Sequence, residues 1–557
     1  MTPNDLPGHL RNPIIRVICG KKWFPNTRPG GANRKVKIKW GNLLAFLLII
    51  AGAIGYFQWD TIRGLIDKQK TTSLPVSKET VIYARDSWIT GGIPELGLAR
   101  GYHRDYDLDL TRTYIPADND RLVALGSGKV HITEMSWPSL LYNLERANGG
   151  QYADDVQVIA FIDYSRGGDG LVVQSSVKTV NDLEGKRVGY VGNGTGKYLV
   201  SFLLRMVDMR FEDVKPHAYD DEKKMEADFA AGNLDAIAYW QPAISNVLKS
   251  VPGSKVLLST ADMPSLIPDV LVANRSWLAE NPAKAEAFLS FWFASVKHLQ
   301  ERPDTAFANW ASALNSAFYE DGGKQELIYG DWNGPIALQR IFTEEVRLVG
   351  FDENQKLMGV SQPADVAALV KFAMDNWKRV EKLNGPNAAE LVNNRAMTAI
   401  KDDVTLKVGA VDAAKTGNAA VEPEKPKEFD KAADPAKLNE VAQMAIPNIE
   451  FDPDATTITP AGRKVLVDVV APLMKQFPNF YLMVDGHTDV GGDEAVLTRL
   501  SQGRADSVKA ELVKLGFPEA QIITRGFGDK KPIFPNPKTD AEKAKNRRTE
   551  FRLLRDQ

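Results

Sequence analysis

The segment 481–492 reads YLMVDGHTDVGG, an apolar run that breaks into a polar loop containing three glycines. A short apolar run that ends at glycine is typical of a buried strand. A helix is expected from about residue 493, and it contains LSQGRADSV at 500–508. With a strand expected at 449–451 and a helix starting at Thr459-Pro460, the pattern predicts a β-α-β-α-β-β domain over 445–557.

Four motifs in this domain resemble the OmpA-like peptidoglycan-binding family. They are Gly-His-Thr-Asp-x-x-Gly, Leu-Ser-x-x-Arg-Ala-x-x-Val, Gly-x-Gly and Asn-Arg-Arg-x-Glu, in family order and spacing. The resemblance implies that Asp489 and Arg504 hold the diaminopimelate of the peptidoglycan stem peptide. A carboxylate can pair with the ligand's ammonium, and a guanidinium can hold its carboxylate through two hydrogen bonds. Thr488 and His487 belong to the same site, with His487 expected to position rather than to catalyse.

Three points in this domain stay open. Asp489 could instead cap the following helix, with Arg504 packing against acids. Leu497 stands where the family usually has asparagine, so wall affinity or peptide preference is expected to differ. Arg547 and Arg548 match the family, and wall contact and closure of the fold are equally compatible with them.

The N-terminal part carries a membrane-spanning pattern. No charge occurs between Trp40 and Trp59, and about 20 residues at ~1.5 Å rise span a ~30 Å hydrocarbon core. Nine Lys/Arg and one acid, Asp5, precede this run. The bias predicts a basic cytoplasmic segment at 1–40, one transmembrane helix at 41–59 and a tether at 60–78. A cleaved signal peptide is the alternative, but the basic segment is long for one.

The region 79–383 alternates strand-like and helix-like patterns, which favours α/β layers. Strands are expected at 81–84, 130–132, 156–161, 171–174 and 187–191, with helices at 196–208 and 221–232 and mostly helix over 282–383. The region resembles solute-binding proteins of ABC importers of the nitrate, sulfonate and thiamine-precursor type. The stretches that carry this resemblance begin at Pro94, Arg121, Gly170, Val180 and Gly232. The resemblance implies two α/β lobes that close on a small molecule.

The cleft between two such lobes collects the carboxyl ends of strands. That rule nominates Ser87, Trp88, Thr90, Ser136, Trp137, Asn193, Thr195, Gly196, Tyr239 and Trp240 as ligand contacts. The strand-to-helix turn at 193–196 could hold an anion on backbone N–H groups. Asp163 and Asp169 could bind an amine or be solvated loop acids, so the charge of the ligand stays open.

Residues 384–444 are expected to be a linker, since 404–444 is rich in Ala, Lys, Glu, Asp and Pro. The fold expected overall is a two-lobed α/β periplasmic-binding-protein fold plus an α+β OmpA-like domain, with one N-terminal transmembrane helix. A single cysteine excludes an internal disulfide, and a net charge of −2 gives no reason to expect nucleic acid.

These features predict a non-enzymatic solute-binding or sensing protein of the inner membrane, with its bulk in the periplasm and attached to peptidoglycan. The alternative is a structural or signalling part of an envelope complex whose middle domain binds a protein, with an inner-membrane partner. An enzyme is disfavoured, because His103, His131 and His217 show no metal-ligand spacing and no nucleophile motif is present. Neither a cofactor nor a metal is expected.

Overall fold

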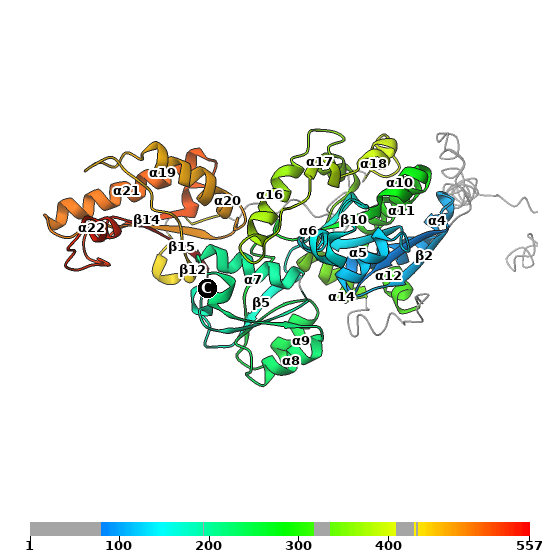
Figure 1. Ribbon diagram of the computed structural model, residues 1–557, viewed down its shortest axis with the longest axis horizontal. Coiled ribbons are helices and arrows are strands. Elements are labelled where there is room, and N and C mark those ends of the chain that lie inside the picture. Colours follow the sequence, from blue (N-terminus) through cyan, green and yellow to red (C-terminus); the bar gives the residue numbers. More distant parts are fainter. Residues whose placement is uncertain (1–79, 193, 317–334, 408–427, 431–432, 557) are drawn as a thin grey trace, which may run out of the picture. The chain divides into compact units, whose positions relative to one another are not determined.

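The computed structural model describes residues 80–192, 194–316, 335–407, 428–430 and 433–556 (Figure 1). The segments predicted as a cytoplasmic region (1–40), a transmembrane helix (41–59) and a tether (60–78) lie outside these ranges. Of the helices within them, none is both long and apolar enough to cross a bilayer.

The first lobe of the middle domain is built on a six-stranded sheet in the order β11-β4-β10-β3-β1-β2. Strands β1, β2 and β3 are parallel, whereas β10 is antiparallel to β3 and β4, and β11 to β4. The strands are β1 Val81–Arg85, β2 Leu110–Tyr114, β3 Ile132–Ser136, β4 Val156–Ser165, β10 Pro268–Asn274 and β11 Val346–Leu348. The strands expected at 81–84 and 156–161 are confirmed, and the one expected at 130–132 lies at 132–136.

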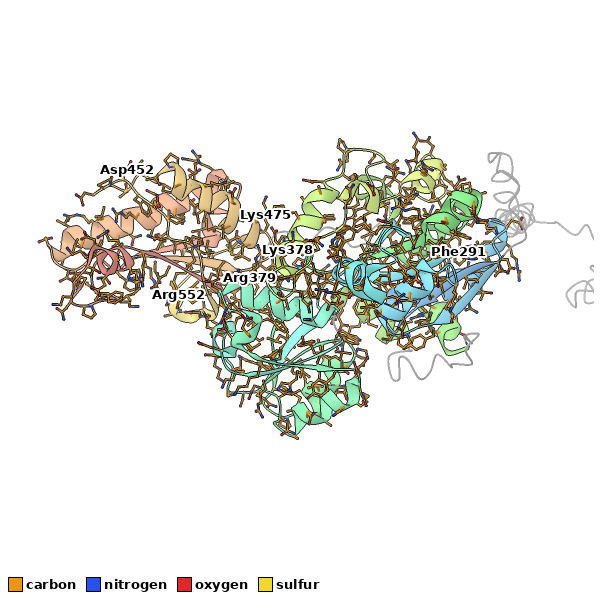
Figure 2. The ribbon with its side chains drawn as sticks, viewed as in Figure 1. Phe291, Lys378, Arg379, Asp452, Lys475 and Arg552 are labelled. Atoms are coloured by element: carbon orange, nitrogen blue, oxygen red, sulfur yellow. The ribbon has the colours of Figure 1, made fainter. Side chains whose placement is uncertain are left out.

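Helices pack around this sheet, in which β1, β3, β4 and β10 are almost completely buried and the edge strand β2 is partly exposed. The helices are η2 Ile89–Gly92, α3 Ile93–Arg100, α4 Tyr102–Asp105, α5 Asp118–Gly126, α6 Trp137–Arg146, η3 Ala147–Gly150, α10 Arg275–Glu280, α11 Pro282–Glu301, α12 Pro303–Ser316, α14 Pro335–Arg340, η7 Ile341–Glu345, α15 Phe351–Leu357 and α16 Val366–Trp377. Helices α3 and α11 approach closely because α3 has glycine at 97. A Cβ there would lie 2.5 Å from the fully buried ring of Phe291, labelled in Figure 2.

The second lobe is a five-stranded sheet in the order β7-β6-β8-β5-β9, with β6 parallel to β7 and β8 and β5 antiparallel to β8 and β9. The strands are β5 Asp169–Val173, β6 Arg187–Val191, β7 Lys215–Tyr219, β8 Ala236–Trp240 and β9 Lys255–Ser259; the helices are η4 Val180–Leu183, α7 Thr195–Met206, η5 Phe211–Asp213, α8 Glu222–Ala230 and α9 Ala243–Ser250. Helices α8 and α9 lie together over one face of this sheet (Figure 1). The helices predicted at 196–208 and 221–232 are confirmed.

Two chain crossings join the lobes, from β4 to β5 and from β9 to β10. The Ser165 hydroxyl lies 2.8 Å from that of Thr260, which ties one crossing to the other. Both hydroxyls accept a hydrogen bond from the backbone N–H of Asp169. This frame fixes the start of β5 and therefore the position of the Asp169 side chain.

The predicted linker 384–444 is too long at both ends. Helices α17 (Ala388–Leu391) and α18 (Arg395–Ile400) pack on the first lobe, where Leu391, Met397 and Leu406 are buried. At the other end, β12 (Asn439–Met444) is already a strand of the C-terminal sheet. A few apolar residues are enough to order these segments, because they pack on the first lobe or, in β12, pair with β15.

The C-terminal domain is a four-stranded sheet in the order β12-β15-β13-β14. Its other elements are η8 Pro435–Lys437, α19 Pro460–Val465, η9 Leu466–Val470, α20 Ala471–Met474, β13 Tyr481–Gly486, α21 Glu494–Lys514, η10 Glu519–Gln521, β14 Ile522–Gly526, α22 Asp540–Asn546 and β15 Thr549–Arg555. The strand expected at 449–451 is wrong, since Phe451 forms only an isolated bridge with Ile458. The first strand of the α+β pattern is β12 instead.

Asp485 closes the C-terminal sheet electrostatically. Its carboxylate is fully buried on β13 and pairs with Arg525 on β14, with Nε to Oδ1 at 2.8 Å. Arg552 on β15 pairs with the same carboxylate. One acid of the glycine-rich motif therefore holds three neighbouring strands together and is not available to a ligand.

Candidate functional site

A cavity of about 600 Å³ lies between the two lobes of the middle domain. That volume is within the range of small-molecule sites, roughly 300–1,000 Å³. Residues from the ends of β1, β3, β6 and β8 line it, as the strand-end rule predicts.

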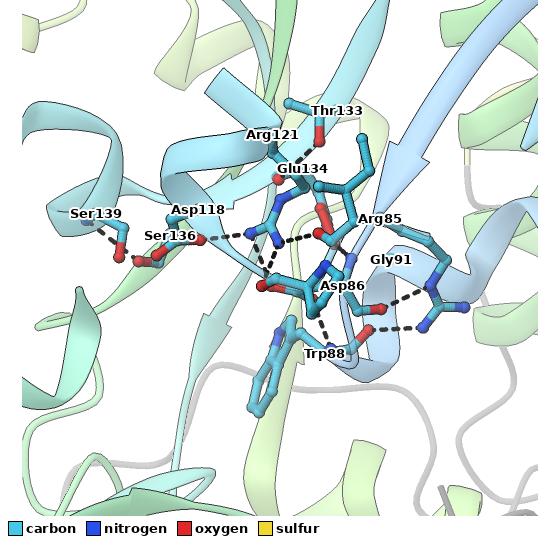
Figure 3. A network of polar contacts seen from close by, with 12 residues as sticks. Arg85, Asp86, Trp88, Gly91, Asp118, Arg121, Thr133, Glu134, Ser136 and Ser139 are labelled. Atoms are coloured by element: carbon cyan, nitrogen blue, oxygen red, sulfur yellow. Dashed lines mark hydrogen bonds and ion pairs between the residues drawn. The ribbon is translucent and has the colours of Figure 1, made fainter. Parts of the chain in front are cut away.

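One wall of the cavity is a network of charged groups in the first lobe, drawn in Figure 3. Buried Arg121 on α5 donates to Asp86 at 2.8 Å and to Asp118 at 2.5 Å. Asp86 in turn accepts a hydrogen bond from the Trp88 backbone N–H at 2.6 Å. The network fixes the β1–η2 turn, so that Ser87 and Trp88 line the cavity.

Glu134 lies beside this network and is 2% exposed. Its Oε1 accepts a hydrogen bond from the Asp86 backbone N–H at 2.8 Å. Its Oε2 has no hydrogen-bond partner among the described residues, although the side chain lines the cavity. Burial and the neighbouring Asp86 raise the pKa of Glu134 well above its usual value.

Three more buried carboxyls gather where the chain crosses between lobes. Asp163 on β4 stands opposite Asp269 on β10, and Asp169 begins β5. Burial raises the pKa of Asp163 to about 6 and that of Asp169 to about 7. Burial, then Asp163 and Asp169, raise the pKa of Asp269 well above its usual value. Asp163 and Asp169 are both buried, so neither is a solvated loop acid, and Asp169 lines the cavity together with Asp269.

The opposite wall comes from the second lobe and includes Glu222 and Trp240. Helix α7 begins at this wall, and its Thr195 hydroxyl lies 2.7 Å from the Ser136 hydroxyl of the first lobe. The Ser136 hydroxyl also caps α6 by accepting from the backbone N–H of Ser139. The Ser136 side chain therefore both caps α6 and forms part of the cavity wall.

The structure brings six of the ten predicted cleft residues to the cavity: Ser87, Trp88, Ser136, Thr195, Gly196 and Trp240. Asn193 lies outside the described residues. The other three predictions are wrong as to placement. Thr90 is fully buried and donates to Asp163, Trp137 is core packed on Phe161, and Tyr239 is buried with its hydroxyl 3.1 Å from Glu222.

The acids that dominate the cavity were mostly not predicted. Asp86, Glu134 and Asp269 lie within strands or one residue past a strand end, close to the predicted Ser87 and Ser136. A count of carboxylates near strand ends would have indicated them. Among the described residues, no three His, Cys, Asp or Glu side chains are grouped so that they could hold a metal ion.

In the C-terminal domain, Asp489 is held by the motif that begins at residue 546. The fully buried Asn546 donates from Nδ2 to Asp489 Oδ1 at 3.0 Å, and Arg547 Nη1 lies 3.8 Å from Oδ2. The cap of α21 is Asp493, whose side chain accepts from the Val496 N–H. The alternative that Asp489 caps this helix is therefore wrong.

Arg504 is half-buried on α21 near the same motif. Its Nε donates to the Ala455 carbonyl at 2.9 Å, and its guanidinium carbon lies 5.1 Å from the centroid of the Phe451 ring. The nearby positive charge of Arg547 contributes to lowering its pKa, after burial. Arg504 forms no ion pair with any described residue, and the negative charge of Asp454 nearby acts in the opposite direction, raising its pKa.

The two motif neighbours of Asp489 are buried. Thr488 donates its backbone N–H to Gly528 at 2.9 Å, and its hydroxyl has no partner within the described structure. His487 stacks on Phe527, with ring centroids 5.2 Å apart, and with Arg548 it lowers the pKa of Glu550 to about 2.

The two arginines of the last motif are now distinguished. Arg548 Nη2 pairs with Glu550 at 2.6 Å and closes the fold, whereas Arg547 is 46% exposed beside Asp489. Leu497 lies on the first turns of α21, where it packs against Gly492 in the preceding loop.

Comparison with known proteins finds a matching family for the C-terminal domain and another for the middle domain. Residues 450–547 match a family model described as OmpA family, and residues 96–306 match one described as NMT1/THI5 like. The chain therefore joins an NMT1/THI5-like domain to an OmpA-family domain. The OmpA-family domain contains Asp489 and Arg504, and the NMT1/THI5-like match covers most of the cavity wall.

The OmpA-family domain is 40% identical over 106 residues to "Probable lipoprotein YiaD" of Escherichia coli (strain K12), covering 19% of this chain and 48% of that protein. The NMT1/THI5-like domain is 24% identical over 210 residues to a Brucella abortus (strain 2308) protein named as a candidate binding protein, covering 37% and 62%. The chain thus spans less than two thirds of either relative. The periplasmic aliphatic sulphonate binding protein SsuA from Escherichia coli has a similar solved structure, at 18% identity, with a TM-score of 0.42, covering 57% of this chain and 93% of its own.

Proposed function

We propose that this chain is a non-enzymatic binding protein of the bacterial cell envelope. Its middle domain takes up a small molecule in the cavity between the lobes, and its C-terminal domain grips peptidoglycan non-covalently. The apolar segment 41–59 anchors it in the inner membrane, with the rest in the periplasm.

The observation that carries this proposal is the pairing of two ligand-ready sites in one chain. The first is a 600 Å³ cavity between two lobes joined by two crossings. The second is the pair Asp489 and Arg504. Arg504 forms no ion pair with a described residue, and the nearest cation to Asp489 in the described fold, Arg547 Nη1, lies 3.8 Å away. Separate sites for a solute and for the wall fit a tethered receptor or sensor.

At the wall site, Asp489 takes the ammonium of diaminopimelate and Arg504 takes its carboxylate. Asn546 holds the Asp489 carboxylate from one side, which leaves Oδ2 to the ligand and to Arg547. Arg504 uses Nε on Ala455, so its terminal nitrogens are the ones that reach the ligand. Thr488, through its backbone hydrogen bond to Gly528, and His487, stacked on Phe527, hold the loop that carries Asp489.

Sedimentation with purified peptidoglycan tests the wall site in the full-length chain, held in mild detergent. Asp489→Asn and Arg504→Ala should each reduce the bound fraction at least tenfold. The controls are Asp468→Asn, an exposed acid on η9, and Arg499→Ala, an exposed arginine on α21. Retention of both site variants at the wild-type level would overturn the assignment.

A protein-binding role for the middle domain, in an envelope complex, is the competing function. It predicts no response of the full-length chain to a thermal-shift screen of small amines and anions, with sedimentation intact. A ligand-induced rise in the melting temperature of the middle domain supports the receptor function instead.

A further inference from the structure

The lining of the middle-domain cavity has a large excess of acidic over basic side chains. Seven carboxylates and one guanidinium line it within the described part of the chain: Asp86, Asp118, Glu134, Asp169, Asp220, Glu222, Asp269 and Arg146. Arg121, which is buried and does not itself line the cavity, forms ion pairs with both Asp86 and Asp118. Arg146 is engaged by Glu381, outside the cavity. The remaining five acids form no ion pair with any described residue.

Glu134 gives an independent indication that a ligand completes this site. It is 2% exposed and lines the cavity, yet its Oε2 has no hydrogen-bond partner within the described structure. Figure 3 shows it next to Asp86. A buried carboxyl oxygen without a hydrogen-bond partner destabilises the unliganded domain, which is a cost in free energy. A donor on the ligand would remove that cost.

We propose that the cleft binds a small organic cation, an amine or quaternary ammonium carried on an apolar body. The inference rests on the proposed function, because it names the class of solute that the middle domain takes. The ammonium would lie between Glu134, Asp169 and Asp269, where it supplies the donor and the charge that the protein does not.

The aromatic lining favours an organic cation over a bare ion. Trp88, Tyr114, Tyr142 and Trp240 line the same cavity. Indole and phenol faces attract ammonium groups and also pack against an apolar body. A metal ion would need closely grouped ligands, and no group of three suitable side chains is formed by the described residues.

The N-terminus of helix α7 is the one feature that favours an anion. It carries roughly half a positive charge, and its first residues line the cavity. However, Asp118 already faces it, because a Cβ on Gly194 would lie 2.7 Å from Asp118 Oδ2. The rest of the lining holds five acids that form no ion pair with any described residue, so the cavity as a whole favours a cation.

Cation binding should be linked to protons. In the unliganded site, burial raises the pKa of Asp169 to about 7, so this group is partly protonated near neutrality. A bound ammonium favours the ionised form, which releases protons and makes affinity rise with pH. The charged groups around Asp169 and its acidic neighbours are Asp86, Arg121, Glu134, Asp163, Asp269 and Arg347. Asp118, Arg146, Asp220 and Glu222 line the same cavity.

The test is calorimetric titration of the full-length chain with probes that share one phenyl ring. The probes are benzyltrimethylammonium, benzylamine, benzyl alcohol and benzenesulfonate, with calcium and zinc chloride as metal arms. We expect both cations to bind at least tenfold more tightly than the alcohol or the sulfonate, and more tightly at pH 8 than at pH 5.5. Asp169→Asn and Glu134→Gln should weaken cation binding at least tenfold, while exposed Glu184→Gln should not.

Each contrary outcome identifies what failed. A preference for the sulfonate, or response to a metal alone, would overturn the cation assignment and leave the receptor function standing. Silence towards every probe, with peptidoglycan sedimentation intact, would overturn the cation assignment and count against the small-molecule function as well. Cation binding that survives both carboxylate substitutions would show that the ligand lies elsewhere.

Discussion

Replacing Asp169 by asparagine should stabilise the unliganded protein, and increasingly so as pH rises. Asp169 is 7% exposed, and burial raises its pKa to about 7, against 3.8 for an accessible carboxyl. The folded state therefore holds the proton more tightly than the unfolded chain does. Its free energy of unfolding falls as pH rises from about 4 to about 7, and the full penalty is present above that.

The size of the effect follows from the two pKa values. The full penalty is roughly 4 kcal/mol, and about 2–3 kcal/mol of it should develop between pH 5 and pH 8. The Asp169→Asn variant has no such penalty, so its advantage over wild type should grow by that amount across this range. Asp163 and Asp269 titrate in both proteins and cancel in the comparison, apart from their coupling to Asp169.

Urea unfolding followed by tryptophan fluorescence measures this in the full-length chain. Eight of the 11 tryptophans lie within 79–383 and none within 445–557, so the fluorescence change reports the middle domain rather than the C-terminal one. Glu184→Gln, an exposed acid outside the cavity, is the control and should show no growing advantage. A stability difference between Asp169→Asn and wild type that is constant from pH 5 to pH 8 would refute the reasoning.

Three substitutions test the remaining structural claims. Asn546→Ala removes the amide that holds Asp489 and should weaken sedimentation with peptidoglycan about tenfold; unchanged sedimentation would exclude the positioning role. Trp377→Ala removes a fully buried indole and should cost about 3–5 kcal/mol in the same urea assay; a loss under about 1 kcal/mol would contradict its place in the core. Asp485→Asn leaves Arg525 facing a neutral amide in the C-terminal sheet and should cost about 3–5 kcal/mol, measured by circular dichroism melting; an unchanged melting temperature would contradict the closing role.

The strand-end rule located the cleft from sequence but could not tell which side chain at each strand end faces it. Neighbouring residues in a strand point to opposite faces. On β8, Trp240 lines the cavity, whereas Tyr239 is buried among the residues that pack beneath α8 and α9. After β3, Ser136 caps α6 and faces the cleft, whereas Trp137 turns into the core against Phe161. Deciding the face needs the packing partner, which a single sequence does not name.

The residues proposed for the wall site could be named from sequence because they lie within short motifs. The resemblance to the OmpA-like family, carried by two of these motifs, implied Asp489 and Arg504, and the structure adds Asn546 as the side chain that holds Asp489. Asn546 and Asp489 are 57 residues apart, so only the fold brings them together. The same is true of β12, whose few apolar residues form a strand because β15 offers an edge to pair with.

The charge of the cleft is likewise a property of the fold rather than of any segment. Asp86, Glu134, Asp163, Asp169 and Asp269 come from five different strands or strand ends, and no local run of sequence is acidic. Gathering them in one buried place destabilises the unliganded domain, as the raised pKa values of four of them indicate. Of the five, only Asp86 has an ion pair with a described residue. Buried acids that lower stability and form no ion pair are characteristic of a binding site. A stabilising effect of Asp169→Asn together with a loss of cation binding would therefore be the strongest joint evidence for the proposed ligand class.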